Sequence, residues 1–158
     1  ISGSGVMSDG RRLIEQSQVM AQDHRVKYQT PTDVLSMVKD LANIKQHYSQ
    51  SGGVRPFGVS LLIGAIEDGN PKLYQTTPSG MYFNYLAKSV GTNSNKIDTF
   101  LEENFKENMS NKDGIKLGLN AFKKVQDTHF DIERFEVVTL DLNEEFIKIS
   151  DNEVSKYK

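Results

Sequence analysis

The stretch SGGVRPFGVSLLIGAI, residues 51–66, decides how this chain folds. From Val59 to Ile63 it is apolar at every position except Ser60, so both faces of an extended segment would be largely apolar. A short apolar run with glycine punctuation predicts a strand over 57–66 that is covered on both faces. Gly52 and Gly53 in front of it are suited to end a helix, because glycine readily takes the left-handed cap conformation. We therefore expect helices against one face of this strand and another sheet against its other face.

Two amphipathic helices are predicted before that stretch. Ser8 and Asp9 are good N-cap types, and the small or apolar residues that follow at helical spacing predict a helix from about residue 9 to 27. Thr30-Pro31 ends this helix and begins a second, which closes near Ser51. The second helix carries its apolar residues on a single stripe, made of Val34, Val38, Leu41, Ala42 and Tyr48.

A hairpin, two further helices and a second pair of strands follow. The turn and strand patterns predict a turn at 67–71, strands at 72–77 and 82–90, and later strands at 135–142 and 146–149 around a turn at Glu144-Glu145. Between them, helical spacing runs from Ile97 to Phe105 and again after Ser110, an N-cap residue type, while 150–153 resembles a capping box for a short final helix. This order favours an α+β fold with a single domain over residues 1–158.

The composition is that of an ordinary globular protein and excludes several classes of site. Nineteen Lys and Arg against 21 Asp and Glu give a formal charge of -2. Because no face of the chain carries a cluster of Lys and Arg, nucleic-acid binding is not predicted. The longest apolar run is too short to span a membrane. Cysteine is absent, so disulfides, thiolate nucleophiles and cysteine-ligated zinc are excluded. The sequence begins without Met, and residues 1–5 are mostly small. We interpret it as part of a longer chain, in which strands of a larger fold precede residue 1.

No constellation of side chains predicts chemistry. His24 and His47 fall on or beside apolar helical stripes and are interpreted as core or boundary residues, and none of the three histidines has metal-ligand spacing to a partner. There is no nucleophile elbow and no phosphate-binding loop. The paired carboxylates are interpreted as solvated charge, and they are Glu67-Asp68, Glu102-Glu103 and Glu144-Glu145. From the residues alone we predict no catalytic residue, no metal site and no cofactor.

Several phrases in the right order resemble one family. Residues 50–63 resemble the Gly-x-Arg-Pro-Phe/Tyr-Gly-Val-Ser pattern of 20S proteasome alpha-type subunits, and residues 4–9 resemble the entry to the first long helix of that family. Residues 73–80 resemble its hairpin, although Thr77 stands where the family usually has Asp. The segments 87–91 and 100–103 complete the series, which fades after about residue 112. The phrases are divided among paralogue types 2, 3 and 4.

The resemblance implies a fold and a function. The fold would be the four-layer αββα sandwich of the Ntn-hydrolase superfamily, lacking its N-terminal strands. The function would be that of a non-catalytic subunit of the heptameric alpha ring in a threonine peptidase complex, contributing to ring assembly, gated substrate entry and activator docking in ubiquitin-dependent degradation. The implied partners are other alpha subunits, beta subunits and the C-terminal tails of regulatory particles, with no nucleic acid, membrane or cofactor, in the cytoplasm and nucleus.

The resemblance also places site residues. Gly5 and Val6 match the pair that lines the activator-docking pocket, where a backbone N–H beside glycine can approach a carboxylate closely; the alternative is a plain strand end. Gly53 and Arg55 match a loop near the axial pore that supports the gating tails. Arg55 could equally fix that loop through a carboxylate pair, which needs no gate.

Two rival functions remain open at this point. One is a catalytic beta-type threonine peptidase, or another Ntn amidohydrolase, whose N-terminal nucleophile lies in the missing part. Beta-type subunits carry an Asp-x-x-Ser-Gly stretch, whereas residues 127–131 read DTHFD, which counts against this rival. The other is a self-standing fragment that binds partners without assembling.

Overall fold

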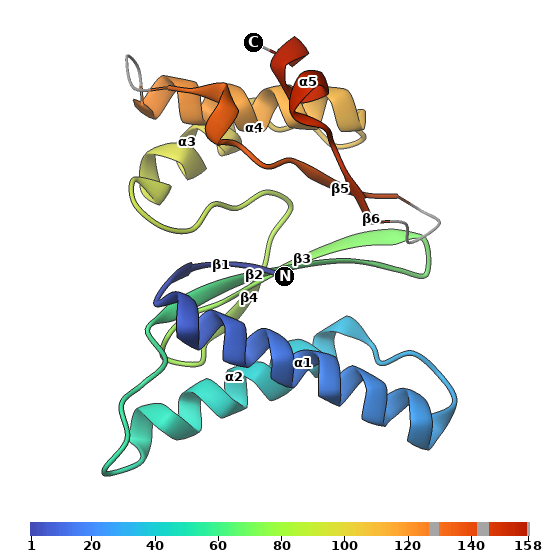
Figure 1. Cartoon of the computed structure of the whole chain (residues 1–158), viewed down its shortest axis with the longest axis vertical. Coiled ribbons are helices and arrows are strands. Elements are labelled where there is room, and N and C mark those ends of the chain that lie inside the picture. The colour runs from blue at the N-terminus through green and yellow to red at the C-terminus, as the bar shows by residue number, and fades with distance from the viewer. Residues whose placement is uncertain (127–129, 142–145, 158) are drawn as a thin grey trace. The chain divides into compact units, whose positions relative to one another are not determined.

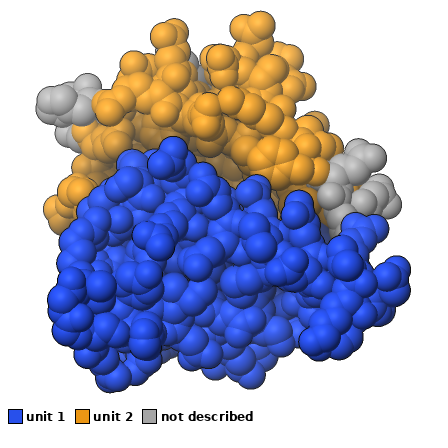
Figure 2. Space-filling view, turned by 60° about the horizontal axis from the view of Figure 1, so that its bottom comes forward, with its two compact units in different colours: residues 1–91 blue, residues 92–158 orange. Residues whose placement is uncertain are grey.

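The computed structural model describes residues 1–126, 130–141 and 146–157. Its contacts divide the chain into two compact units, residues 1–91 and 92–158, which Figure 2 colours blue and orange. This division does not test the expectation of a single domain over 1–158, which stays a prediction.

The first unit is built on a four-stranded antiparallel sheet in the order β1-β2-β3-β4 (Figure 1). Its strands are β1 (Ser2–Gly5), β2 (Val59–Glu67), β3 (Asn70–Thr76) and β4 (Tyr82–Asn84). β2 is the predicted strand at 57–66, and it pairs with β1 on one side and β3 on the other. The residue pattern alone did not predict β1, because serine and glycine make a weak strand signal.

Helices α1 (Met7–Tyr28) and α2 (Val34–Gln50) lie together on one face of this sheet (Figure 1). Val59, Leu61 and Ile63 are buried against them at 1%, 0% and 2% exposure. The intervening residues Ser60 and Leu62 point to the opposite face, as the two-residue period of a strand requires, and are half-buried. The core is completed from the helices mainly by Leu13, Val38 and Leu41, each fully buried.

The helix starts differ from prediction in an informative way. α1 begins at Met7, and its N-cap position, Val6, makes no side-chain capping bond. Asp9, predicted near the cap, is instead buried and bonded to a distant part of the chain, as described below. α2 begins after Asp33, whose carboxylate accepts the Ser36 N–H at 2.8 Å. Glu67, which we had interpreted as solvated, is half-buried and accepts the Val34 N–H at 3.0 Å.

The predicted turn at 67–71 is confirmed between β2 and β3, and a second turn follows β3. Asp68 and Gly69 both have positive φ, which is the two-residue hairpin geometry. After β3, the Thr77 hydroxyl accepts the Met81 N–H at 3.1 Å. Gly80, at φ +87°, lies against α2, where a Cβ would come within 2.6 Å of the Ala42 carbonyl oxygen.

The strand predicted at 82–90 is wrong beyond its first residues. β4 ends at Asn84, and one more bond, from Tyr85 N–H to Leu73 O at 2.9 Å, closes the pairing. The following segment returns toward β1 instead, so that a Cβ on Gly91 would lie 2.7 Å from the Ser4 hydroxyl oxygen. Without a neighbouring strand to pair with, the apolar residues of this segment cannot extend the sheet.

The described part of the second unit consists of two longer helices, three short helical segments and a small antiparallel sheet. Its described elements are α3 (Ser94–Asn104), α4 (Asn111–Gln126), η2 (Ile132–Arg134), β5 (Val138–Leu140), β6 (Phe146–Lys148), α5 (Asp151–Val154) and η3 (Ser155–Tyr157). Their core is a cluster of Leu119, Ile132 and Val154, packed by half-buried aromatic and aliphatic side chains. The α+β class is therefore confirmed from antiparallel sheets and separate helices.

Local predictions in this unit hold in outline. The Ser110 hydroxyl accepts the Asp113 N–H at 3.1 Å and so caps α4. At the predicted capping box, the Ser150 hydroxyl donates a hydrogen bond to the Glu153 carboxylate at 3.2 Å. The strand predicted at 135–142 is shorter, because η2 and the chain after it delay pairing until Val138. The turn predicted at Glu144-Glu145 lies outside the described residues.

Candidate functional site

Three of the four residues singled out by sequence, Gly5, Val6 and Arg55, lie around one buried carboxylate. Asp9 lies in the first turn of α1 with 7% of its surface exposed. Its two oxygens each accept a hydrogen bond from the Arg55 guanidinium, Oδ1 from Nη2 and Oδ2 from Nη1, both at 2.7 Å. Oδ2 also accepts the Gly58 N–H at 2.9 Å. This bidentate geometry is the strongest form of an Arg–carboxylate pair.

The electrostatics of Asp9 follow from these partners. The hydrogen bond from Arg55 and then that from Gly58 lower the pKa of Asp9 to about 2, against the opposing effect of burial. Arg55 also donates to the Pro56 carbonyl at 3.0 Å, while 64% of its side chain remains exposed. The alternative interpretation of Arg55, a loop fixed through a carboxylate pair, is thus confirmed, and its support of a pore stays a prediction.

Gly5 and Val6 adjoin the same carboxylate. Gly5 ends β1 at φ +130°, and a Cβ there would lie 2.1 Å from the Gly58 carbonyl oxygen, so only glycine fits. The Val6 N–H donates to that oxygen at 2.8 Å, and the Val6 side chain is 43% exposed. Gly5 is a strand end, as the alternative interpretation has it, and activator docking stays a prediction.

Gly53 lies apart from this cluster. Its φ is +79°, and a Cβ built on it would meet nothing within 4 Å. It turns the exposed loop that precedes Arg55, and no contact of the described residues shows a further role. The structure therefore brings together Gly5, Val6 and Arg55, with Asp9 as the connecting group, and leaves Gly53 at the open end of the loop.

A second buried charge was missed from the sequence. Lys45 on α2 has 0% of its surface exposed, and its Nζ donates to Val59 O at 3.0 Å, Thr76 O at 3.3 Å and Thr76 Oγ1 at 2.7 Å. These three acceptors match the three N–H bonds of an ammonium group. Burial lowers the pKa of Lys45 to about 8. The signal was available, because position 45 continues the apolar stripe of positions 38, 41 and 42.

The described residues contain few candidates for chemistry. Ser51 Oγ lies 3.4 Å from His47 Nε2, but the same hydroxyl donates to the His47 carbonyl at 2.8 Å. That bond makes Ser51 a cap of α2, and among the described residues no hydrogen bond orients the His47 imidazole as a base. The His24 ring packs on Tyr28, and its Nδ1 lies 3.1 Å from the Thr30 carbonyl oxygen, within hydrogen-bond distance. His129 lies outside the described residues.

Within 1–126, 130–141 and 146–157, no group of three or more His, Asp or Glu side chains is placed to hold a metal ion. Over those residues, no helix combines the length and the apolar character that a membrane crossing needs.

Comparison with known proteins identifies close relatives. A family model described as "Proteasome subunit" matches residues 1–140. "Proteasome subunit alpha 2" of Haloarcula marismortui is 36% identical over 157 residues, covering 99% of this chain and 64% of the relative. "Proteasome subunit alpha" of Methanosarcina acetivorans is 36% identical over 155 residues, with 98% and 63% covered. That of Pyrobaculum aerophilum is 44% identical over 120 residues, with 76% and 49% covered. The chain thus spans less than two thirds of the length of these relatives.

The Asp9 pair predicts a measurable loss of stability. Asp9→Asn keeps the shape but removes the charge that Arg55 and Gly58 bind, so we expect the free energy of unfolding to fall by about 1–3 kcal/mol. Urea denaturation at pH 7 measures it. Glu15→Gln is the matched control, because Glu15 pairs with Arg11 at 3.8 Å on the exposed surface and should change stability by less than about 0.5 kcal/mol.

The same pair fixes the sign of the pH dependence. Folding lowers the pKa of Asp9 from 3.8 to about 2, so the folded chain binds fewer protons than the unfolded chain between these values. The advantage of the wild type over Asp9→Asn should be complete above about pH 4 and disappear as the pH falls through 2. Equal losses for Asp9→Asn and Glu15→Gln, or a difference independent of pH, would contradict this account.

Lys45 predicts a rise of stability with pH in the alkaline range, of the same sign as the rise that Asp9 predicts in acid. Because folding lowers its pKa from 10.5 to about 8, the unfolded chain binds the extra proton between these values. The free energy of unfolding of the wild type should therefore rise relative to Lys45→Met between pH 8 and 10.5, by on the order of 3 kcal/mol. Denaturation at both pH values measures this, with Lys39→Met, an exposed lysine of the same helix, as control. Parallel pH profiles for wild type and Lys45→Met would refute it.

Proposed function

Because the chain belongs to the proteasome subunit family, we propose that it is the larger part of a non-catalytic alpha-type subunit. The observation that supports this most is the agreement of the family match with the named relatives: the model covers 1–140, and three relatives from separate genera are each named a proteasome alpha subunit. In this proposal the chain contributes to a heptameric ring with other alpha subunits, stacked on a ring of beta subunits.

The complete subunit would adopt the four-layer αββα sandwich. The first unit supplies one helical layer, α1 and α2, and one sheet in contact with it. The half-buried residues on the other face of β2, among them Leu62, suit a second sheet as the next layer.

Gating and docking are proposed for the corner around Asp9. Gly5 and Val6 would line the pocket that takes the C-terminal tail of a regulatory particle, and the loop with Gly53 and Arg55 would support the gating tails. Asp9 favours a joint role, because it bonds to Arg55 and Gly58 while Val6 bonds to Gly58 as well. The subunit would act in ubiquitin-dependent degradation in the cytoplasm and nucleus.

Isolation of assemblies tests this function. The subunit, tagged in the cells that encode it, should co-purify with other alpha and beta subunits, and native mass spectrometry should find seven alpha-type chains in a ring. The purified 158-residue chain should hydrolyse no peptide in a manner blocked by an inhibitor directed at N-terminal threonine. Inhibitor-sensitive turnover by this chain would favour the beta-type or other Ntn amidohydrolase instead, and isolation without other subunits would favour a self-standing partner-binding protein.

A further inference from the structure

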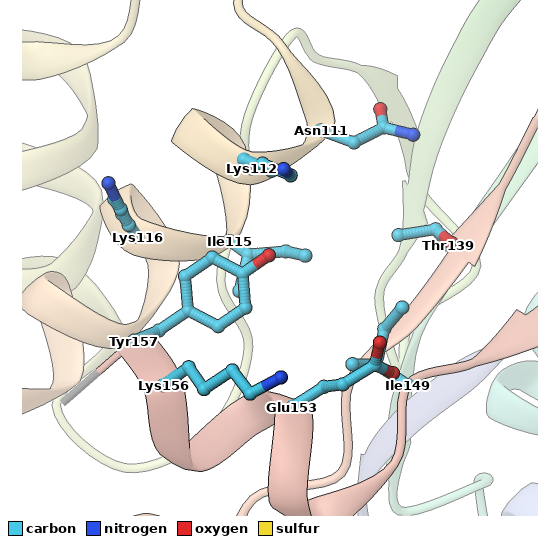
Figure 3. Close-up of a pocket in the computed structure, with 9 residues that line it drawn as sticks. All are labelled: Asn111, Lys112, Ile115, Lys116, Thr139, Ile149, Glu153, Lys156 and Tyr157. Atoms are coloured by element: carbon cyan, nitrogen blue, oxygen red, sulfur yellow. The ribbon is translucent and has the colours of Figure 1, made fainter.

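A hollow of about 510 Å³ opens within the second unit (Figure 3). It is formed by the first turns of α4, by strand β5 and by the short helices at the end of the described chain. None of the residues around Asp9 lines it. Ile149 and the residues of α5 and η3 lie beyond the 1–140 span of the family model, so this part of the hollow is outside the family pattern.

The rim of the hollow is positively charged. Lys112 and Lys116 come from α4 and Lys156 from η3, against one carboxylate, that of Glu153. Within the described part of the chain, none of these three lysines forms an ion pair, whereas Glu153 accepts a hydrogen bond from the Ser150 hydroxyl at 3.2 Å. Three ammonium groups and one carboxylate leave the lining with two formal positive charges.

The floor of the hollow is apolar. Ile115, Ile149 and the Tyr157 ring are half-buried and pack on the cluster of Leu119, Ile132 and Val154. Figure 3 shows Lys112 and Asn111 at one end of the hollow and Lys156 and Glu153 at the other, with Ile115 and Tyr157 along one side and Thr139 opposite. An apolar group that enters would therefore be flanked by ammonium groups at both ends.

We propose that this hollow binds an acidic peptide segment that inserts one aliphatic or aromatic side chain between the lysines. Sites for small molecules are mostly apolar and enclose their ligand, whereas six of the nine residues here are polar or charged. Ammonium groups on an open rim around an apolar floor are complementary to carboxylates on both sides of an apolar anchor. The positive end of the α4 dipole at Asn111 adds to the attraction.

The test uses the 158-residue chain and three capped pentapeptides. Glu-Asp-Phe-Asp-Glu carries both charge and anchor, Glu-Asp-Ser-Asp-Glu lacks the anchor, and Gln-Asn-Phe-Asn-Gln lacks the charge. Fluorescence anisotropy of labelled peptides should show saturable, salt-sensitive binding of the first alone. Lys112→Glu combined with Lys156→Glu should weaken it by at least about tenfold, because both ends of the hollow then repel the peptide.

Lys123→Glu combined with Lys124→Glu is the matched control, since it makes the same charge change on two exposed residues of α4 that do not line the hollow. It should leave binding within about twofold of the wild type. No saturable binding of the acidic peptide, or equal weakening by the control, would overturn the proposal. Competition by inorganic phosphate at equal concentration would indicate that the hollow binds small anions. Dimerisation of the chain that depends on these lysines would indicate that it binds a second copy. Either result would overturn the proposal of a peptide ligand.

Discussion

The arrangement of the first unit depends on a single buried carboxylate, that of Asp9. It is held by two bonds from Arg55 and one from the Gly58 backbone, each between 2.7 and 2.9 Å. These bonds tie the start of α1 to the loop that leads into the central strand. β1 joins the same corner through the Val6 N–H and through Gly5, whose missing Cβ allows the two backbones to touch. A side chain near the front of the chain thus sets the position of the loop that carries the family's Arg-Pro-Phe-Gly pattern.

Lys45 plays the corresponding part beneath the sheet. Its ammonium group reaches from α2 to the backbone of both β2 and β3, and so replaces part of an apolar core by three hydrogen bonds. Burying a charge without a carboxylate partner is costly, which is why its pKa falls. Asp9 stabilises the fold in its charged form, whereas Lys45 costs stability in its charged form. The Lys45 ammonium group fixes the position of α2 along the sheet, because a shift of the helix by one residue would separate the ammonium from its acceptors on β2 and β3.

The sequence predicts this fold where periodicity is strong and local. Both helices of the first unit, the buried strand at 59–67 and its hairpin follow from spacing, glycine and turn residues. Asp9 shows the limit, because a cap-type residue before a helix has the same sequence signature as one that reaches a partner 46 residues away. β4 is a second case, since an apolar segment extends a sheet only where a neighbouring strand continues. Lys45 is a third case. Hydropathy places lysine at the surface, and only its position on the apolar stripe of α2 indicates that it is buried. Gly5 and Arg55 were found only through the family pattern.

A double-mutant cycle between Asp9 and Arg55 tests this account most directly. Asp9→Asn, Arg55→Gln and the double variant, measured by urea denaturation at pH 7, give the energy of coupling between the two side chains. If the pair holds the corner together, the two single losses will not add, and the coupling will be at least about 1 kcal/mol. The amide of Gly58 should also exchange its hydrogen faster in each variant. Additive losses, with Gly58 protected as in the wild type, would contradict the account, because the corner would then be held without the pair.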